Sequence, residues 1–315
     1  MAIFFDDDGR KISDVVVSTA LGQSGRGIFS KTLSFKYRKF VQLVLDKDVT
    51  IFTKPSTRYP KVGNFRIQYP WTWKYIKKIC HRSMLNLYGL TNSGVKINAK
   101  KIAYSSEMGF SVIPSYYPEF KKGVSIALQE LGESVDIYHK YIGDDFWAIE
   151  INGSCVNSGE IIEENMDNIV LCVSMLKKVH PKLVIIIKTS IEHPYDFYKR
   201  LEDAGADAIH AINSIPYRIV YPNDVSPFHK KGGGGVSGEI TFSLSYHYSK
   251  ELKKYTTLPI IMGCGVTDIF SKIMFMKEAD ADSVSVCTIA LLDPEEACRI
   301  IGPVDDVKCN ISFAV

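Results

Sequence analysis

A cysteine set between two asparagines is the clearest sign of chemistry in this sequence. Residues 148–157 read AIEINGSCVN, so a short apolar segment ends at Asn152 and is followed closely by Cys155 and Asn157. A cysteine that loses its proton readily acts as a nucleophile or a base, and amide side chains both donate and accept hydrogen bonds. The alternative is that Cys155 is a small buried hydrophobe and the asparagines cap a helix beginning near residue 160. This run alone leaves both interpretations open.

Two lysines follow apolar segments rich in β-branched residues. Lys54 comes directly after VTIFT at 49–53, and Lys188 lies near the end of LVIIIKT at 183–189. A lysine in such a place most often extends its ammonium group to solvent. Two lysines at comparable places are harder to explain in this way.

The spacing of the apolar segments predicts the elements that would bring these side chains together. Eight runs rich in β-branched residues alternate with amphipathic stretches, which is typical of a parallel sheet covered by helices. The runs are 15–19, 49–53, 110–115, 148–152, 183–189, 208–213, 258–263 and 283–288. Helices are expected at 34–46, 95–108, 119–131, 160–178, 195–204, 243–254, 270–278 and 294–301. We therefore predict an α/β fold, a TIM (β/α)8 barrel, with a doubly wound sheet as the alternative.

Two connections, 54–94 and 214–242, are too long for ordinary turns. Long inserted loops at the C-terminal face of a barrel usually build or cover its site. Glycine-rich turns at 230–240 and 259–268 are candidates for holding a phosphate, although the quartet at 232–235 is better explained as a flexible surface loop. No repeat or linker divides the sequence, so a single domain over 1–315 is expected.

The composition argues against several classes of function. With 315 residues, 46% hydrophobic and 23% charged, the chain can bury a large core, and a net charge of +3 gives no reason to expect nucleic acid as a partner. The start lacks the order of a signal peptide, and no apolar run approaches the roughly 18 residues that span a membrane. Seven scattered cysteines without zinc spacing suggest free thiols in a cytoplasmic protein without a metal.

Several motifs, in order from about residue 15 to 292, resemble those of the dihydroorotate dehydrogenases. AIEINGSCVN is similar to the ELNxSCPN segment around the family's catalytic cysteine, and LNLYGLTNSG at 85–94 is similar to its NSMGLPNxG segment. Further matches are TKPST at 53–57, IKTS at 187–190, INS at 212–214 and GVSGE at 235–239. The cysteine and the short stretch before the first strand resemble the soluble class 1 branch. Tyr88 in place of methionine, and Cys264 and Cys287 in place of glycine, mark a divergent member.

The resemblance implies an FMN-dependent oxidation of (S)-dihydroorotate to orotate in pyrimidine biosynthesis. It implies Cys155 as the base, with Lys54 beside it in the catalytic centre. The residues implied for the substrate are Lys54, Asn86, Tyr88, Gly89, Leu90, Asn152, Asn157, Asn213 and Ser214. Those implied for FMN are Ala20, Gly22, Lys54, Ser56, Asn152, Lys188, Gly238, Cys264, Gly265, Cys287 and Thr288. A homodimer that uses a fumarate-type acceptor is favoured over transfer to NAD through an iron–sulfur partner subunit.

Three other functions fit parts of the sequence. The first is a flavin-free, phosphate-binding barrel lyase in which Lys188 forms a Schiff base. The second is a barrel that only binds its ligand. The third is a flavin enzyme acting on a different dihydropyrimidine, against which Lys54 argues because a carboxylate on the substrate would give it a partner. A yellow colour of the purified protein would separate the flavoenzymes from the others.

Overall fold

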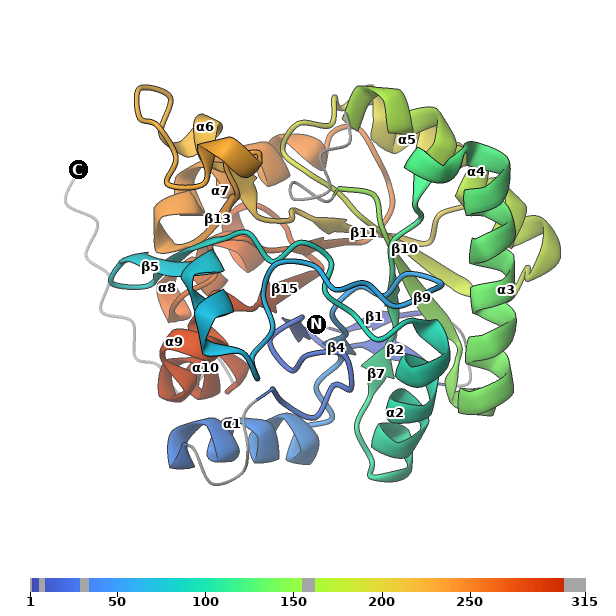
Figure 1. Cartoon of the computed structure of the whole chain (residues 1–315), viewed down its shortest axis with the longest axis horizontal. Coiled ribbons are helices and arrows are strands. Elements are labelled where there is room, and N and C mark those ends of the chain that lie inside the picture. The colour runs from blue at the N-terminus through green and yellow to red at the C-terminus, as the bar shows by residue number, and fades with distance from the viewer. Residues whose placement is uncertain (1, 6–8, 29–33, 155–161, 303–315) are drawn as a thin grey trace.

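Eight parallel strands form a barrel at the centre of the computed structural model, which describes residues 2–5, 9–28, 34–154 and 162–302 (Figure 1). Nine segments make up these eight strands, because one strand is in two halves: β3 (Val15–Ser18), β4 (Ile51–Phe52), β7 (Val112–Ile113), β8 (Ser115–Tyr116), β9 (Ala148–Asn152), β10 (Val184–Lys188), β11 (Ala208–Ala211), β14 (Ile260–Met262) and β15 (Ser283–Val286). Their order is β7-β4-β3-β15-β14-β11-β10-β9-β8. The two halves, β7 and β8, are separated by Pro114. Because β7 pairs with β4 and β8 pairs with β9, the ring of strands is closed. The predicted barrel is confirmed and the doubly wound alternative is wrong.

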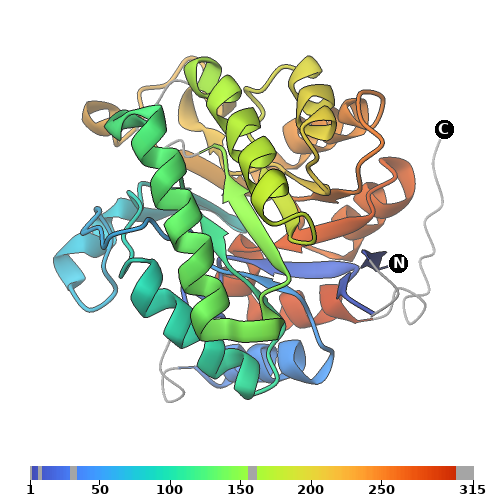
Figure 2. The same ribbon diagram turned by 90° about the vertical axis from the view of Figure 1, so that its right-hand side faces the viewer.

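Helices surround the barrel at nearly the predicted places. They are α1 (Phe35–Asp46), α2 (Val95–Glu107), α3 (Val124–Ile142), α4 (Ile162–Val179), α5 (Asp196–Asp203), α7 (Phe242–Leu252), α8 (Ile269–Ile273) and α10 (Pro294–Ile301). Figure 2 shows α3 and α4 lying side by side across the outside of the barrel. The helix predicted at 119–131 is misplaced: Gly123 has φ 100°, outside the helical range, so α3 begins only after it. Two short helices, α6 (Tyr217–Val220) and α9 (Thr288–Leu292), were not predicted.

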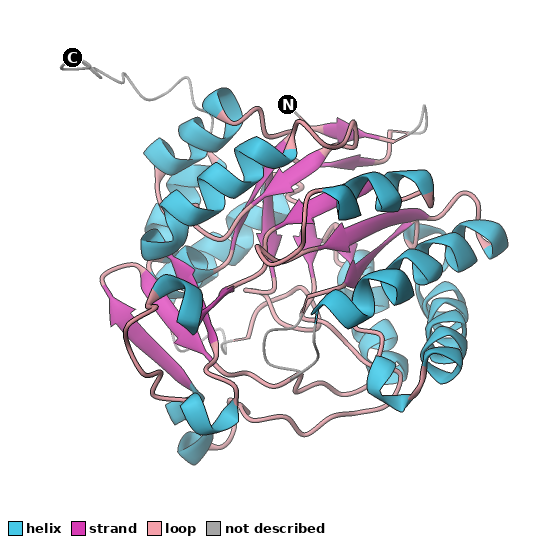
Figure 3. Cartoon of the chain, turned by 90° about the horizontal axis from the view of Figure 1, so that it is seen from above, coloured by secondary structure: helices cyan, strands magenta, loops and turns pink. Residues whose placement is uncertain are grey.

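The two long connections are not merely loops, because they meet in a second, antiparallel sheet. It consists of β12 (Ile215–Pro216), β13 (Gly235–Gly238), β6 (Ser83–Asn86) and β5 (Ile76–Cys80), in that order. Figure 3 shows strands of this sheet to the left of the barrel. The prediction of a flexible loop at 232–235 is wrong at its last residue, because Gly235 is a buried strand residue paired with Asn86. The insertion sheet, as we call these four strands, thereby fixes Asn86 beside the barrel.

The barrel interior is apolar at one end and polar at the other. Alternate strand residues point inward, and the apolar layer includes Val16, Phe52 and Ile186. A hairpin of β1 (Ile3–Phe4) and β2 (Lys11–Ile12) packs Ile3 and Ile12 against that layer. The opposite end faces the insertion sheet and carries the side chains described below. Within the described residues, no helix is long and apolar enough to cross a membrane. That 1–315 form a single domain stays a prediction.

Candidate functional site

A cavity of about 490 Å³ lies between the carboxyl ends of the barrel strands and the insertion sheet. Its volume is within the range of about 300–1,000 Å³ that is usual for small-molecule and cofactor sites. The predicted site residues that line it are Gly22, Lys54, Asn86, Tyr88, Gly89, Leu90, Asn152, Lys188, Asn213, Ser214, Gly238, Cys264, Gly265, Cys287 and Thr288. The fold therefore brings residues from all parts of the chain to one place.

Two of the predicted site residues that the structure describes are not among this lining. Ala20 is buried, and its carbonyl oxygen accepts a hydrogen bond from the Tyr37 hydroxyl at 3.0 Å. Ser56 is also buried, and its backbone N–H donates to the carbonyl of Ser115 at 2.9 Å. Cys155 and Asn157 lie outside the described residues.

Lys188 is held at the floor of the cavity and does not extend to solvent. Its side chain is almost fully buried, and Nζ donates to Ser18 Oγ at 2.6 Å across the barrel. The Glu150 carboxylate lies nearby in the barrel interior. Burial raises the pKa of Glu150, but the charge of Lys188 and hydrogen bonds from His210 and Ser115 outweigh this effect and hold the pKa at about 2. The cavity floor thus combines a cation with an ionised carboxylate beneath it, and solvent extension is wrong for Lys188.

The loops after β9 and β11 are tied together by amide side chains. Asn213 Nδ2 donates to the carbonyl of Ser154 at 2.6 Å, and Asn152 Oδ1 accepts from the Ser154 N–H at 3.2 Å. The N–H of Gly153 donates to the carbonyl of Lys188 at 3.0 Å. The backbone is therefore fixed up to the residue that precedes Cys155.

Lys54 lies on the side of the cavity formed by the first long connection. Its Nζ is 3.7 Å from the centre of the Tyr88 ring, close enough for a cation–π contact. Burial raises the pKa of Tyr88 to about 12, so its hydroxyl stays neutral. This corner of the cavity therefore carries a cation together with an uncharged hydroxyl.

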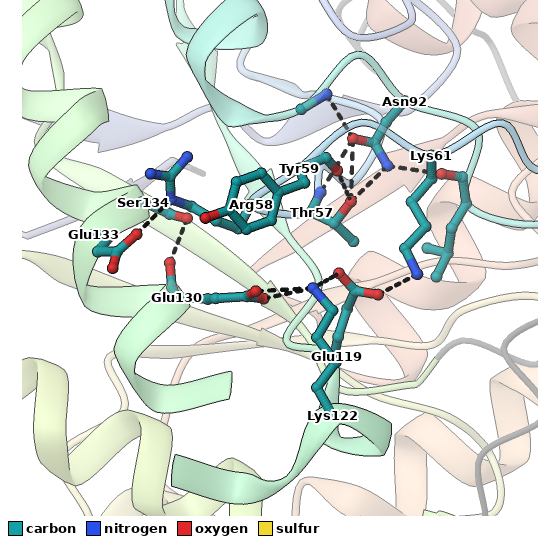
Figure 4. A network of polar contacts seen from close by, with 12 residues as sticks. Thr57, Arg58, Tyr59, Lys61, Asn92, Glu119, Lys122, Glu130, Glu133 and Ser134 are labelled. Carbon is teal, nitrogen blue, oxygen red and sulfur yellow. Dashed lines mark hydrogen bonds and ion pairs between the residues drawn. The ribbon is translucent and has the colours of Figure 1, made fainter. Parts of the chain in front are cut away.

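A polar network fastens the segments that carry Lys54 and Tyr88 to the barrel (Figure 4). Thr57 N–H donates to Asn92 Oδ1 at 3.2 Å, and Asn92 Nδ2 donates back to Thr57 Oγ1 at 3.0 Å. The buried carboxylate of Glu119 pairs with Lys61 and with Lys122, the latter at 2.9 Å. Because these contacts join three separate segments, they restrict the movement of the loops around the cavity.

The glycine positions at the other end of the cavity allow close backbone approach. A Cβ at Gly265 would lie 2.7 Å from Phe242 Cα, and one at Gly238, where φ is 105°, would collide with the carbonyl of Arg82. Thr288 begins α9, and its hydroxyl is 2.8 Å from that of Ser237. Cys264 has φ 63°, so its backbone adopts the left-handed conformation that favours glycine, although cysteine has a Cβ. The turn therefore accommodates the cysteine that replaces the family's glycine.

The sequence did not single out several residues that the structure places in or beneath the cavity. Ser18, Ser237 and Ser285 line it, while Glu150 and His210 lie behind the lining in the barrel interior. Serine is too common for its type to indicate a site. For Glu150 the sequence offered only its position as a signal. It lies two residues before Asn152, so the two side chains point inward on the same side of β9.

Comparison with known proteins gives one consistent result. No family model matches the chain. The catalytic subunit of dihydroorotate dehydrogenase B (NAD(+)) from Porphyromonas gingivalis is 25% identical over 295 residues, which are 92% of this chain and 87% of the relative. Those from Thermoanaerobacter sp. and Oceanobacillus iheyensis are 26% and 24% identical over 71% and 84% of this chain, and 76% and 82% of their own lengths. With its barrel and its motifs in matching order, the chain is a divergent relative of the class 1 dihydroorotate dehydrogenases.

Proposed function

We propose that this protein uses FMN to oxidise (S)-dihydroorotate to orotate in pyrimidine biosynthesis. The observation that carries the proposal is the meeting of Lys54, Lys188 and three asparagine side chains in one cavity at the carboxyl ends of the strands. The relatives named above, whose similarity extends over most of this chain, support the same assignment.

The substrate half of the cavity fits a pyrimidine with a carboxylate. Lys54 offers a cation for the carboxylate, while Asn86, Asn152 and Asn213 offer amides for the ring's N–H and C=O groups. Asn86 is oriented by donating to the carbonyl of Gly235 at 3.0 Å. Asn157 would join this set from the segment outside the described residues.

The other half of the cavity fits FMN. Lys188 would hold the N1 and C2 carbonyl edge of the isoalloxazine, and backbone N–H groups near Gly238, Gly265 and Thr288 would hold the phosphate. Apolar residues also line the cavity, among them Ile28, Met84, Leu291 and Leu292, and they suit a flat ring. When bound, FMN supplies the acceptor for the hydride that leaves the substrate.

We assign to Cys155 the removal of the substrate proton. Asn152 and Asn213 fix the backbone that leads to it, through the two contacts made by Ser154. A general base contributes about two to four orders of magnitude in rate. Cys155→Ser should therefore slow anaerobic reduction of the bound flavin by dihydroorotate at least about a hundredfold, as followed by stopped-flow absorbance. A variant as fast as wild type would remove Cys155 from the mechanism.

The electron acceptor is proposed to be soluble. A fumarate-type acceptor and a homodimer in the cytoplasm were expected from the sequence and stay predictions. The relatives carry NAD(+) and "catalytic subunit" in their names, which favours the NAD route instead. Reoxidation of the reduced protein by fumarate, but not by NAD, together with a dimeric mass in solution, would support the first route. Failure of fumarate to reoxidise the protein, with reoxidation by NAD only when an iron–sulfur partner subunit is present, would support the second.

The purified protein itself tests the proposal most directly. Flavin absorbance bands that bleach on addition of dihydroorotate, with orotate as the product, are the expected result. Colourless protein that neither binds FMN nor forms orotate would contradict the proposal. That result would favour the flavin-free barrel lyase that uses Lys188.

A further inference from the structure

A chain of hydrogen bonds runs through the barrel interior and ends at the cavity floor. The two oxygens of Glu150 contact Ser115 Oγ at 2.5 Å and His210 Nδ1 at 2.6 Å. The other ring nitrogen, His210 Nε2, is 2.9 Å from Ser285 Oγ. Glu150 and His210 are fully buried, whereas Ser285 lines the cavity. The chain thus links a buried carboxylate to a hydroxyl that a ligand can reach.

The direction of these hydrogen bonds follows from the charge of Glu150. An ionised carboxylate only accepts, so the Ser115 hydroxyl and His210 Nδ1–H both donate to it. Burial and the charge of Lys188 lower the pKa of His210 to about 4, so the ring is neutral near pH 7. Neutral imidazole with its proton on Nδ1 has a lone pair on Nε2, which accepts the Ser285 hydroxyl proton. Ser285 therefore turns its proton away from the cavity and its lone pairs toward it.

The opposite direction would be costly inside the barrel. If Ser285 donated to a ligand, Nε2 would have to carry the proton of the neutral imidazole. The Nδ1 lone pair would then face the Glu150 carboxylate at 2.6 Å with no proton between them. Two acceptors in contact without solvent leave both unsatisfied, which the folded protein avoids.

We propose that Ser285 is a hydrogen-bond acceptor of fixed direction that selects a ring N–H on the bound ligand. Lys188 supplies a donor on the same side of the floor, because its Nζ reaches Ser18 on β3, the strand that pairs directly with β15. A donor beside an acceptor recognises the N–H and C=O edge of a planar heterocycle. This inference rests on the proposed function in its choice of ligand: oxidised FMN has a single ring N–H, at N3.

The test compares the binding of FMN and 3-methyl-FMN, which lacks that N–H, to apoprotein by quenching of flavin fluorescence. We expect wild type to prefer FMN by about ten- to a hundredfold, the effect of leaving a buried acceptor unpaired. Ser285→Ala should weaken FMN binding about tenfold and leave the binding of 3-methyl-FMN unchanged or tighter. The matched control is Ser115→Ala, which removes a hydrogen bond from the same carboxylate but not from the His210 arm, and it should keep the wild-type preference.

Other outcomes would overturn the proposal. Equal weakening of both flavins in Ser285→Ala would make Ser285 a donor or a packing residue. Unchanged FMN binding with tighter 3-methyl-FMN binding would show that only the size of the methyl group matters.

The direction of the relay can be measured without any ligand. In the apoprotein, long-range proton–nitrogen NMR should show His210 Nδ1 protonated and Nε2 unprotonated at pH 7, with the signal assigned by its loss in His210→Gln. A proton on Nε2 would refute the direction itself. The expected tautomer in a protein that binds neither flavin would instead show that the FMN assignment had failed.

Discussion

Lys188 illustrates how one residue at the cavity floor is coupled to the barrel core. Its ammonium group balances the Glu150 carboxylate, whose pKa of about 2 keeps it ionised. Lys188 and Glu150 interact through their charges without a direct ion pair, and breaking a direct buried pair costs about 3–5 kcal/mol. We therefore expect Lys188→Met to lower the free energy of unfolding in urea by up to that amount and to bind FMN weakly.

The double variant Lys188→Met/Glu150→Gln separates these two effects. It should recover much of the lost stability, because the uncompensated carboxylate is gone, but not the flavin binding. If Lys188→Met were as stable and as yellow as wild type, the interaction with Glu150 and the place of Lys188 beside the flavin would both be disproved.

Lys54 should decide which pyrimidine the cavity accepts. Orotate has a carboxylate that uracil lacks, and a hydrogen bond to a charged group is worth about 1.5–3 kcal/mol. Orotate should therefore bind the oxidised protein about ten- to a hundredfold more tightly than uracil, as measured by perturbation of the flavin spectrum. In Lys54→Met the preference should largely disappear. Equal binding of the two ligands by wild type would show that the substrate is different.

At the scale of elements, the sequence predicted the barrel strands, which follow from the pattern of apolar residues. It missed the insertion sheet, which depends on pairing between segments far apart in the chain. The barrel strands lie in runs of β-branched and apolar residues, so all eight were found. The insertion sheet was missed because β13 reads GVSG, which lacks the side chains typical of strands, and its partner β6 is about 150 residues away. The predicted site residues make up half of the cavity lining. Ser18, Ser285, Glu150 and His210 were missed because their roles depend on which way alternate strand residues point.

The glycines before β13 test whether this pairing supports the site. Gly232 and Gly234 have similar φ values of 88° and 81°, so alanine is strained at both. A Cβ at Gly232 would meet no atom within 4 Å, whereas one at Gly234 would lie 2.8 Å from the carbonyl oxygen of Asn86. We expect Gly232→Ala to cost about 1–2 kcal/mol of stability and to leave orotate binding unchanged. Gly234→Ala should cost more and also weaken orotate binding; equal effects would mean that Asn86 does not depend on this contact.

At the scale of the whole molecule, buried neutral histidines should make the fold sensitive to mild acid. His193 is buried after β10, stacks on Phe197 with ring centres 4.7 Å apart, and accepts the Ser190 N–H on Nδ1 at 2.9 Å. Burial lowers its pKa from 6.5 to about 4, and burial is also the main cause that lowers the pKa of His210 to about 4. Both groups bind a proton more readily in the unfolded chain than in the folded protein.

The sign of the pH dependence follows from this difference. Above pH 6.5 both histidines are neutral in either state, and their full contribution to stability is present. As the pH falls from about 6.5 to 4, the unfolded chain takes up protons that the folded protein does not, so stability decreases by up to about 1.4 kcal/mol per pH unit for each histidine. Urea unfolding at pH 7 and pH 5 measures this slope. His193→Asn, whose side-chain oxygen can still accept the Ser190 N–H, should reduce the slope by about one proton, and an unchanged slope would show that His193 does not resist protonation in the folded protein.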